Sequence, residues 1–496
     1  MTVATGLVQH LERPLARGHA PAGAHTGAAG GAACGDLIRI SLALDPHSPD
    51  GRIVDAGFDA SGCGATIAAG SAVVALLHDA PLLQAALIGP DAITAELGGL
   101  IPAKRHAAEL AADALHRALG FALRGQARLA PADRRTLVAM SGGVDSAVAA
   151  LLVSQAGEEA VAVTLELWSD PENDGSLSCC SAQAVRVARS LAHDLGVPHF
   201  SIDLRAEFRA GVVDPWLDAH AGGLTPNPCV RCNGSVRLDA MLDLATRLGS
   251  PALATGHYAR IHRPPRARGG PLLQMAVDPA KDQSYALTAL SPASLERLRF
   301  PLGELTKPEV RALAERAGLP VACRPDSQDL CFLAGTRQTD FLARHGRLGP
   351  RAGPIVDRDG RILGEHPGTH TVTVGQRRGL GAMRGADGGG PLYVLATDPT
   401  SNTITVGPRA ELLTHTVPVR DVTLHRDGVL VDAIKVRYRG ARLCCRLAEC
   451  PSAGTHPSVE VELIEPAERT APGQIACLYA GELIVGHGTI AAPTLP

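Results

Sequence analysis

The stretch Ser-Gly-Gly-Val-Asp-Ser at residues 141–146 decides the fold of the longest part of this chain. It follows an apolar run, Thr136–Met140, that is typical of a strand, and it precedes a run, Ala147–Gln155, that is typical of a helix. A glycine turn at such a junction exposes backbone N–H groups at the positive end of the helix and forms an anion cradle. The Gly-Lys-Ser/Thr ending of a Walker loop is missing, so we expect ATP to be split to AMP and pyrophosphate, with Asp145 near the metal. An ordinary glycine turn in a sheet protein is the alternative.

Strand-like and helix-like runs alternate beyond this turn. Apolar runs at Ala160–Leu167 and His199–Leu204 flank a helical pattern at Ser181–Leu195, and a further strand is expected at Pro251–Thr255. This order predicts a doubly wound parallel sheet that binds its ligand at the carboxyl ends of the strands. Beyond about residue 345, short alternating runs separated by Gly and Pro predict small β domains.

Composition narrows the class of protein. A chain of 496 residues holds about three or four domains, and a net charge of −3 leaves room only for local basic surfaces. The first residues lack the pattern of a signal peptide, and no run reaches the ~20 apolar residues that span a bilayer, so we expect no membrane contact. Twelve cysteines without an export signal point to thiol or metal chemistry in a bacterial-type cytoplasm.

A second informative stretch is Thr-Pro-Asn-Pro-Cys-Val-Arg-Cys-Asn at 225–233. Its prolines predict a shaped loop rather than a helix interior. The Cys-x-x-Cys spacing of Cys229 and Cys232 suits a shared metal or a redox pair, and spacing leaves both open. A third cysteine, Cys331, lies in Asp-Ser-Gln-Asp-Leu-Cys-Phe at 326–332, and spacing does not bring it beside Cys232. We interpret five further cysteines as small buried hydrophobic residues: Cys323, Cys444, Cys445, Cys450 and Cys477.

From about residue 136 to its end, the chain resembles the tRNA-specific 2-thiouridylases called MnmA (or TrmU), which are PP-loop ATP pyrophosphatases. The motifs above carry this resemblance, together with Ala-Thr-Gly-His-Tyr at 254–258, Lys-Asp-Gln-Ser-Tyr at 281–285 and Gly-Gln-Arg-Arg-Gly-Leu-Gly at 375–381. The resemblance implies an α/β multidomain protein with a doubly wound PP-loop domain, a small β domain and a C-terminal β-barrel.

The resemblance also implies a reaction. ATP with Mg²⁺ would adenylate the C2 oxygen of the wobble uridine in a tRNA anticodon loop, and a persulfide on Cys331 would attack C2. Cys232 would complete the exchange by forming a disulfide with Cys331. The catalytic residues would then be Cys232, Cys331 and Asp145, and the sulfur would come from a cysteine desulfurase or a sulfur relay carrier. A base in a folded anticodon loop must be splayed out before its C2 can be reached, which suits a rigid proline loop.

Family site residues map onto matching positions of this chain. The nucleotide pocket maps to Ala139, Met140, Ser141, Gly142, Gly143, Val144, Asp145, Ser146, Leu165 and Gly256. The target-base contacts map to Asn227, Pro228 and Cys229. The other tRNA contacts map to His257, Lys281, Asp282, Gln283, Gln376, Arg437 and Tyr438.

One position departs from the family pattern, because many members have Asp where this chain has Cys229. Cys229, Cys232 and Cys331 could therefore hold a [4Fe–4S] cluster whose free iron binds sulfide. The persulfide route and the cluster route compete, and we place the persulfide route first.

The first 127 residues resemble iron–sulfur scaffold proteins of the IscU/NifU N-terminal type. Two cysteine sites match around Cys34 and Cys63, whereas the third site, usually His-Cys, reads His106-Ala107. Cys34, Asp36, Cys63 and His106 still offer donors for Zn²⁺ or a weakened iron–sulfur cluster. The alternative is a degenerate scaffold that serves for docking. A fused scaffold would raise the local concentration of a sulfur or cluster donor near Cys331.

We expect four domains: a scaffold-like α+β domain at 1–127, a catalytic domain at 133–345, a β domain at 346–412 and a β-barrel at 413–496. Two other functions stay open. One is a different AMP-forming PP-loop ligase, and the other is an iron–sulfur or zinc carrier with a regulatory ATP site.

Overall fold

The computed structural model describes residues 5–31, 35–125, 127–170, 181–265, 269–326, 330–333, 335–380 and 390–492. The chain divides into two compact units. The first comprises the residues up to 205 together with 240–257 and 297–331, and the second comprises 206–239, 258–296 and the residues from 332 onward.

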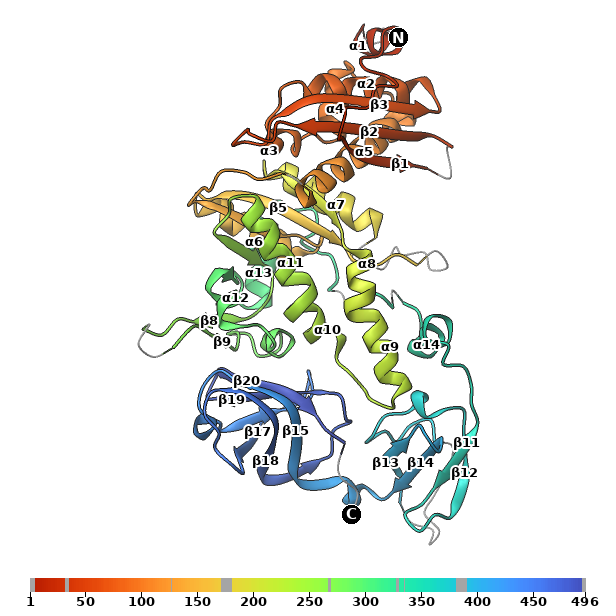
Figure 1. Cartoon of the computed structure of the whole chain (residues 1–496), viewed down its shortest axis with the longest axis vertical. Coiled ribbons are helices and arrows are strands. Elements are labelled where there is room, and N and C mark those ends of the chain that lie inside the picture. Colours follow the sequence, from red (N-terminus) through yellow and green to blue (C-terminus); the bar gives the residue numbers. More distant parts are fainter. Residues whose placement is uncertain are drawn as a thin grey trace. The chain divides into compact units, whose positions relative to one another are not determined.

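The first unit begins with an antiparallel sheet of three strands in the order β1-β2-β3. Helices α2 and α5 contact each other and the strands, and they cover one face of this sheet (Figure 1). The strands alternate buried and exposed residues, which is the pattern of a sheet with one covered face. The elements are α1 (Thr5–Glu12), β1 (His25–Gly30), β2 (Leu37–Leu44), β3 (Ile53–Ser61), α2 (Gly64–Leu77), α3 (Leu82–Ala85), α4 (Pro90–Glu96), the 3₁₀ turn η1 (Pro102–Lys104) and α5 (Arg105–Arg124).

A parallel sheet of five strands completes the first unit, in the order β10-β7-β4-β5-β6. The strand order reverses at β4, which makes the carboxyl end of β4 the topological switch point where such sheets bind ligands. The residues of β4 and β5 are almost continuously buried, as expected for a sheet covered on both faces. The elements are β4 (Arg135–Ala139), α6 (Val144–Gln155), β5 (Glu159–Glu166), α7 (Ala182–Asp194), β6 (His199–Asp203), β7 (Ala252–Thr255), β10 (Leu298–Arg299) and α13 (Lys307–Arg316).

Helix α5 packs directly against strand β6, so the two sheets of the first unit share a buried seam. His116 Nδ1 lies 3.0 Å from the carbonyl oxygen of His199, and a Cβ added at Gly120 would lie 2.1 Å from the carbonyl oxygen of Ser201. Asp113 on α5 accepts hydrogen bonds from Arg186 and from the buried Arg189 on α7. The segment that joins the two domains is held as well, because the Leu129 amide donates to the Arg247 carbonyl at 2.8 Å and the Ala132 amide donates to the Gly249 carbonyl at 2.9 Å.

The second unit starts with helices that lead to the cysteine motif, followed by small sheets. The helical elements are α8 (Arg205–Phe208, which starts at the last residue of the first unit), the π-helix η2 (Arg209–Val213), α9 (Asp214–Ala221), α10 (Pro228–Arg231), the π-helix η3 (Cys232–Arg237), α11 (Leu238–Arg247, which runs back into the first unit), η5 (Ser284–Leu287), α12 (Pro292–Arg297) and α14 (Gln338–Gly346). A mixed sheet in the order β12-β11-β14-β13 follows, and it is formed by β11 (Gly353–Val356), β12 (Ile362–His366), β13 (Tyr393–Asp398) and β14 (Thr403–Gly407), with the 3₁₀ turns η6 (Thr369–Thr371) and η7 (Arg409–Leu412).

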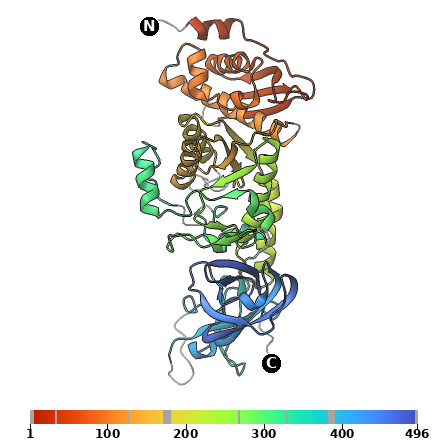
Figure 2. The same cartoon turned by 90° about the vertical axis from the view of Figure 1, so that its left-hand side faces the viewer.

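Six strands close into a barrel at the C-terminal end, because β15 pairs with both β18 and β20 (Figure 2). Strands β9 and β8 extend the sheet beyond β20. Val419, Ile434, Val461 and Leu478 belong to the buried core of the barrel. The strands are β8 (Arg260–His262), β9 (Leu272–Gln274), β15 (Leu413–Leu424), β16 (Ala433–Lys435), β17 (Leu443–Leu447), β18 (Gly454–Glu468), β19 (Ile475–Ala480) and β20 (Leu483–Ile490), with the 3₁₀ turn η8 (Gly428–Leu430).

The predicted fold class is confirmed: an α+β domain, a parallel α/β domain, a small β domain and a β-barrel follow one another along the chain. Among the described helices, none combines the length and the apolar character needed to cross a bilayer. The domain boundaries stay predictions.

Candidate active site

The predicted phosphate loop joins β4 to α6, as expected from the glycine turn. Gly142 has a φ of +73°, a conformation that favours glycine, and Gly143 is the N-cap of α6. The Ser146 hydroxyl accepts a hydrogen bond from the Ser141 amide at 3.1 Å and donates one to the Gly143 carbonyl at 3.0 Å. These bonds hold the loop in an open turn around the N-terminus of α6, which is where an anion binds.

The other predicted nucleotide residues lie at the ends of neighbouring strands. Ala139 at the end of β4 pairs with Val163, so Leu165 lies two residues further along the adjacent strand β5. Gly256 follows β7, and a Cβ at that position would lie 2.8 Å from the backbone nitrogen of Ser146. The structure therefore brings the three predicted segments together at the switch point, and only glycine fits at residue 256.

A cluster of charged side chains at this loop was not anticipated from the sequence. Lys307 Nζ lies 2.7 and 2.8 Å from the two carboxylate oxygens of Asp145 and 2.8 Å from Asp326 Oδ1. Arg311 also contacts Asp326 at 3.1 Å, and Arg324 donates to the Gly142 carbonyl at 2.9 Å. The local signal at Thr306–Glu309 is a capping box that predicts a helix start, but it does not indicate which residues the lysine meets.

The cysteine motif corrects one prediction, because Cys229 and Cys232 lie in helical turns and not in a shaped loop. Pro228 occupies the first position of α10, where its missing N–H costs no hydrogen bond, and Asn227 caps the helix by accepting from the Cys229 amide at 3.0 Å. Cys232 begins the π-helix η3. Cys229 is exposed and Cys232 is buried.

The segment that carries Cys331 is held by different interactions at its two ends. Asp326 makes the ion pairs with Lys307 and Arg311 described above. Phe332, directly after the half-buried Cys331, packs in the second unit against Trp216 and Phe341, with a ring-centroid distance of 5.2 Å to each. Residues 327–329 lie outside the described part of the chain, and the pairing of Cys331 with Cys232 stays a prediction.

Several predicted tRNA contacts converge within the second unit. Burial raises the pKa of the Tyr438 phenol, with smaller contributions in the same direction from Cys229 and Asp282, so these side chains are electrostatic neighbours. The opposing contributions include one from Lys281. The rings of Tyr285 and Tyr438 lie 6.1 Å apart between centroids, so the motif at 281–285 lies close to the barrel within the second unit.

The Asp282 side chain is itself buried and organises its turn. Its carboxylate accepts hydrogen bonds from the Ala276 amide at 3.0 Å and from the Ser284 hydroxyl at 2.9 Å. The neighbouring Gln283 side chain accepts from the Tyr258 amide at 3.0 Å, which joins the motifs at 254–258 and 281–285.

The remaining predicted tRNA contacts lie in three places. Gln376 folds its side chain back onto its own loop, donating to the Arg378 carbonyl at 2.7 Å. Arg437 donates to the Arg469 carbonyl at 3.1 Å and lines a cavity of about 620 Å³ at the barrel. His257 belongs to the first unit, and its Nδ1 lies 2.7 Å from the Thr255 hydroxyl.

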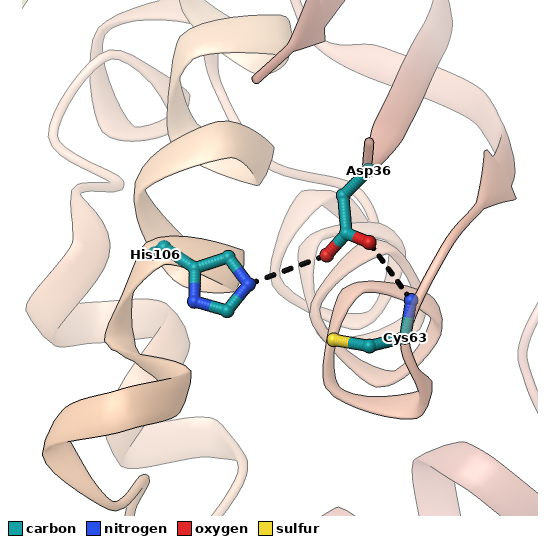
Figure 3. A group of neighbouring side chains, drawn as sticks. All are labelled: Asp36, Cys63 and His106. Carbon is teal, nitrogen blue, oxygen red and sulfur yellow. Dashed lines mark hydrogen bonds and ion pairs between the residues drawn. The ribbon is translucent and has the colours of Figure 1, made fainter. Parts of the chain in front are cut away.

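Three of the four predicted metal ligands of the N-terminal domain meet (Figure 3). The donor atoms of Asp36, Cys63 and His106 all lie within 4.8 Å of one another, while Cys34 lies outside the described residues. Asp36 accepts from the Cys63 amide at 3.0 Å and from the Thr66 hydroxyl at 2.6 Å. The Thr66 hydrogen bond is the largest cause that lowers the pKa of Asp36 to about 2, so this carboxylate is ionised at neutral pH.

The imidazole of His106 is oriented as in many metal sites. Its Nδ1 lies 3.1 Å from the Ala103 carbonyl oxygen, and its Nε2 lies 3.3 Å from Asp36 Oδ2. Metal-binding histidines usually donate one ring N–H to a carbonyl and direct the other nitrogen at the ion. Gly62 permits this arrangement, because a Cβ there would lie 2.2 Å from Asp36 Oδ1. One thiol, one imidazole and one carboxylate form a donor set that suits Zn²⁺.

The interpretation of the five other cysteines as buried is partly wrong. Cys445 and Cys477 are buried, whereas Cys323, Cys444 and Cys450 are exposed. Burial in the barrel raises the pKa of the Cys445 and Cys477 thiols to about 12, so these two are inert as nucleophiles. The residue type alone does not show whether a cysteine on a strand or in a turn faces the core or the solvent.

Comparison with protein families assigns the chain in four successive matches. Residues 4–125 match the NifU-like N terminal domain, and residues 134–335 match the tRNA methyl transferase HUP domain. Residues 339–408 match the tRNA methyl transferase PRC-barrel domain, and residues 423–490 match the aminomethyltransferase beta-barrel domain.

One of the relatives described here matches 98% of this chain, and two others match 72–73% of it. The bifunctional protein NifU/MnmA of Rubrobacter xylanophilus is 43% identical over 498 residues, which cover 98% of this chain and 98% of that protein. The tRNA-specific 2-thiouridylase MnmA of Methylorubrum extorquens is 42% identical, and the match covers 73% of this chain and 94% of that protein. The protein of the same description from Sorangium cellulosum is 42% identical over 72% of this chain and 92% of its own length.

Proposed function

This chain belongs to the family of bifunctional NifU/MnmA proteins, and from this premise we propose that it is an ATP-dependent tRNA 2-thiouridylase that forms AMP and pyrophosphate. The observation that carries the proposal is the open glycine turn at the switch point of the parallel sheet, with Gly256 packed against its backbone. A turn without its own lysine suits an ATP whose bond between the α- and β-phosphates is broken.

The first step is adenylation of the substrate base. The C2 oxygen of the wobble uridine attacks the α-phosphorus, the bond to the bridging oxygen breaks, and pyrophosphate leaves with the electron pair. The loop amides and the N-terminus of α6 stabilise the phosphate charge. The carboxylate of Asp145 offers an oxygen ligand for the Mg²⁺ that accompanies ATP, and that ion would neutralise phosphate charge.

The second step inserts sulfur. The terminal sulfur of a persulfide on Cys331 attacks C2, and AMP leaves. The Cys232 thiolate then attacks the Cys331 sulfur, which forms a Cys232–Cys331 disulfide and leaves the second sulfur on the base as 2-thiouridine. An external thiol reductant restores the two cysteines. The exposure of Cys229 beside Tyr438 supports a contact with the target base.

The test is an anaerobic assay with ATP, unmodified tRNA and a cysteine desulfurase with cysteine, which delivers sulfur already at the oxidation level of a persulfide. Wild-type protein should release pyrophosphate and form 2-thiouridine. Cys331→Ala and Cys232→Ala should abolish 2-thiouridine, while Cys450→Ala, an exposed barrel cysteine, serves as the matched control. Full activity of Cys331→Ala would favour another AMP-forming ligase, and metal binding without tRNA-dependent pyrophosphate release would favour a carrier.

For the N-terminal domain we propose a metal centre that uses Asp36, Cys63, His106 and Cys34, and that takes Zn²⁺ or an iron–sulfur cluster. A cysteine desulfurase or a sulfur relay carrier would be its partner. The support is the convergence of three donor atoms and the orientation of His106 by the Ala103 carbonyl. The domain packs on the catalytic sheet along the α5–β6 seam, so it is held in the same unit as the nucleotide loop.

Metal content and cobalt(II) absorption of the full chain test this centre. Cys63→Ala should remove the bound metal and should slow thiolation when the protein sulfur donor is limiting, but not when that donor is in excess. The Cys450→Ala control should retain metal. A Cys63→Ala protein that keeps a full complement of metal would exclude the proposed ligand set.

A further inference from the structure

Helix α7 forms one wall of the phosphate loop. It packs against α6 and against the strands β5 and β6. A Cβ added at Gly142 would lie 3.0 Å from the carbonyl oxygen of Ala184 and 3.5 Å from the backbone nitrogen of Ala188, both on α7. Ser181 caps this helix by accepting a hydrogen bond from the Ala184 amide at 3.1 Å. A shift of α7 therefore changes the space in which the glycine turn is held.

The same helix is tied to the N-terminal domain by two arginines. Arg186 donates two hydrogen bonds to Asp113 Oδ2, at 2.8 Å from Nε and 2.6 Å from Nη2. Arg189 donates to Asp113 Oδ1 at 2.8 Å. Residues three positions apart on a helix are neighbours on one side of it, so both guanidinium groups reach the same carboxylate. Asp113 lies on α5 of the N-terminal domain and holds α7 with both of its oxygens.

Burial makes this attachment strict. The side chains of Asp113 and Arg189 are 12% and 4% exposed, so water does not readily replace either partner. The imidazoles near Arg189 offer no charge at neutral pH, because burial lowers the pKa of all three: His116, His193 and His199. Asp113 is therefore the counter-charge of Arg189 within the described part of the chain. Directed hydrogen bonds between charged groups fix a geometry as well as adding energy.

We propose that Asp113 is a positioning residue for the nucleotide: through Arg186 and Arg189 it holds α7 in the place against Gly142 that the phosphate loop needs. In this role Asp113 acts without touching the substrate, by raising the fraction of the protein whose loop is ready to bind ATP. The N-terminal domain then completes the nucleotide site, in addition to the metal centre proposed for it. The inference rests on the proposed use of ATP and adds a residue of the N-terminal domain to it.

A domain that served only as a tether would leave a different signature. It would raise the local concentration of a sulfur donor. Binding of ATP in the absence of both tRNA and donor would then not depend on Asp113.

ATP binding to the full-length protein, without tRNA or sulfur donor, tests the proposed role. Calorimetric titrations compare wild type, Asp113→Asn, Arg186→Gln and the control Ser71→Ala. The Ser71 hydroxyl is buried within the N-terminal domain and bonds to His10 and to the Leu15 amide, so its loss destabilises that domain away from α7. Asp113→Asn should weaken ATP binding about tenfold, Arg186→Gln about threefold and Ser71→Ala less than about twofold.

Hydrogen exchange separates positioning from a general loss of stability. At a temperature where circular dichroism shows every variant to be folded, the amides of residues 141–146 and of the first turn of α7 should exchange faster in Asp113→Asn and Arg186→Gln. In Ser71→Ala they should exchange as in wild type, although this variant also unfolds at a lower temperature than wild type. If Asp113→Asn does not fold, Arg186→Gln decides, because it leaves the Asp113–Arg189 pair intact.

Steady-state thiolation assays supply a further readout. Asp113→Asn should raise the KM for ATP about tenfold, while kcat at saturating ATP and the KM for tRNA stay within about threefold of wild type. Two results would overturn the inference: ATP affinities of Asp113→Asn and Arg186→Gln that equal that of Ser71→Ala, or unchanged exchange of residues 141–146 in both variants. If both variants lose ATP affinity but wild type forms no 2-thiouridine, the proposed function fails and the role of Asp113 stands.

Discussion

Asp36 and Asp145 belong to the same compact unit, yet their surroundings are opposite in charge. Asp36 accepts hydrogen bonds from the Thr66 hydroxyl and the Cys63 amide, and it lies beside a thiol and an imidazole. Asp145 instead meets the ammonium of Lys307. The first carboxylate lies among groups that could bind a metal cation, whereas the second is already paired with an ammonium group beside the phosphate loop. The partners of an aspartate, and not the residue type, decide what its site can bind.

The largest effect is expected at the seam where the N-terminal domain packs against the catalytic domain. Asp113→Asn removes the carboxylate that faces Arg186 and the buried Arg189, and it leaves a guanidinium without its counter-charge. We expect the free energy of unfolding to fall by about 3–5 kcal/mol in denaturant titrations. Asp91→Asn breaks an exposed pair with Arg105 and should change it by less than about 0.5 kcal/mol. Equal effects of the two variants would contradict the buried seam.

The next largest effect is expected at the phosphate loop, residues 141–146, without an effect on the N-terminal domain. In Gly256→Ala, the new Cβ would lie 2.8 Å from the backbone of Asp145 and Ser146, so the phosphate loop must shift. We expect tRNA-dependent pyrophosphate release to fall about a hundredfold, since misplacement of about 1 Å has costs of this order. Metal content of the N-terminal domain should not change. Loss of both properties together would show that the variant unfolds the unit rather than the loop.

A smaller effect concerns Asp36, whose contribution to the free energy of unfolding depends on pH. The pKa of Asp36 is lowered from 3.8 to about 2, so the folded state favours the ionised carboxylate. This stability is present above pH 3.8 and is lost as the pH falls through about 2. We expect metal-free wild type to lose about 2 kcal/mol more than Asp36→Asn between pH 5 and pH 2, measured by denaturant titration. Parallel curves for the two proteins would contradict the assigned pKa.

The smallest effect is expected at Cys229, and it tests whether metal binding is confined to the N-terminal domain. Cys229 is exposed, and its neighbours include Tyr438 and Asp282. If the persulfide route operates, Cys229→Ala should change the thiolation rate by no more than about threefold, and the iron content of the protein should not change. Complete loss of thiolation together with loss of iron would instead support the [4Fe–4S] route.

Local features of this protein were predictable because neighbouring residues encode them. The strand, glycine turn and helix at 136–155 were predicted and confirmed, since hydrophobic periodicity and glycine act over a few residues. The cysteine motif was placed in a loop and proved helical, because proline at the first helical position is compatible with a helix. We interpreted these prolines as excluding a helix, whereas Pro228 in fact marks the start of one.

The fold class, the glycine turn at 141–146 and the choice of Asp36, Cys63 and His106 as candidate metal ligands follow from the sequence alone. Only the tertiary structure decided that Lys307 meets Asp145 and Asp326, and that Asp113 joins two domains through Arg189. These contacts could not be predicted because the partners lie far apart in the sequence. Packing of α13 against α6 creates the lysine contact, and two residues 162 positions apart share no periodicity or spacing from which it could be read.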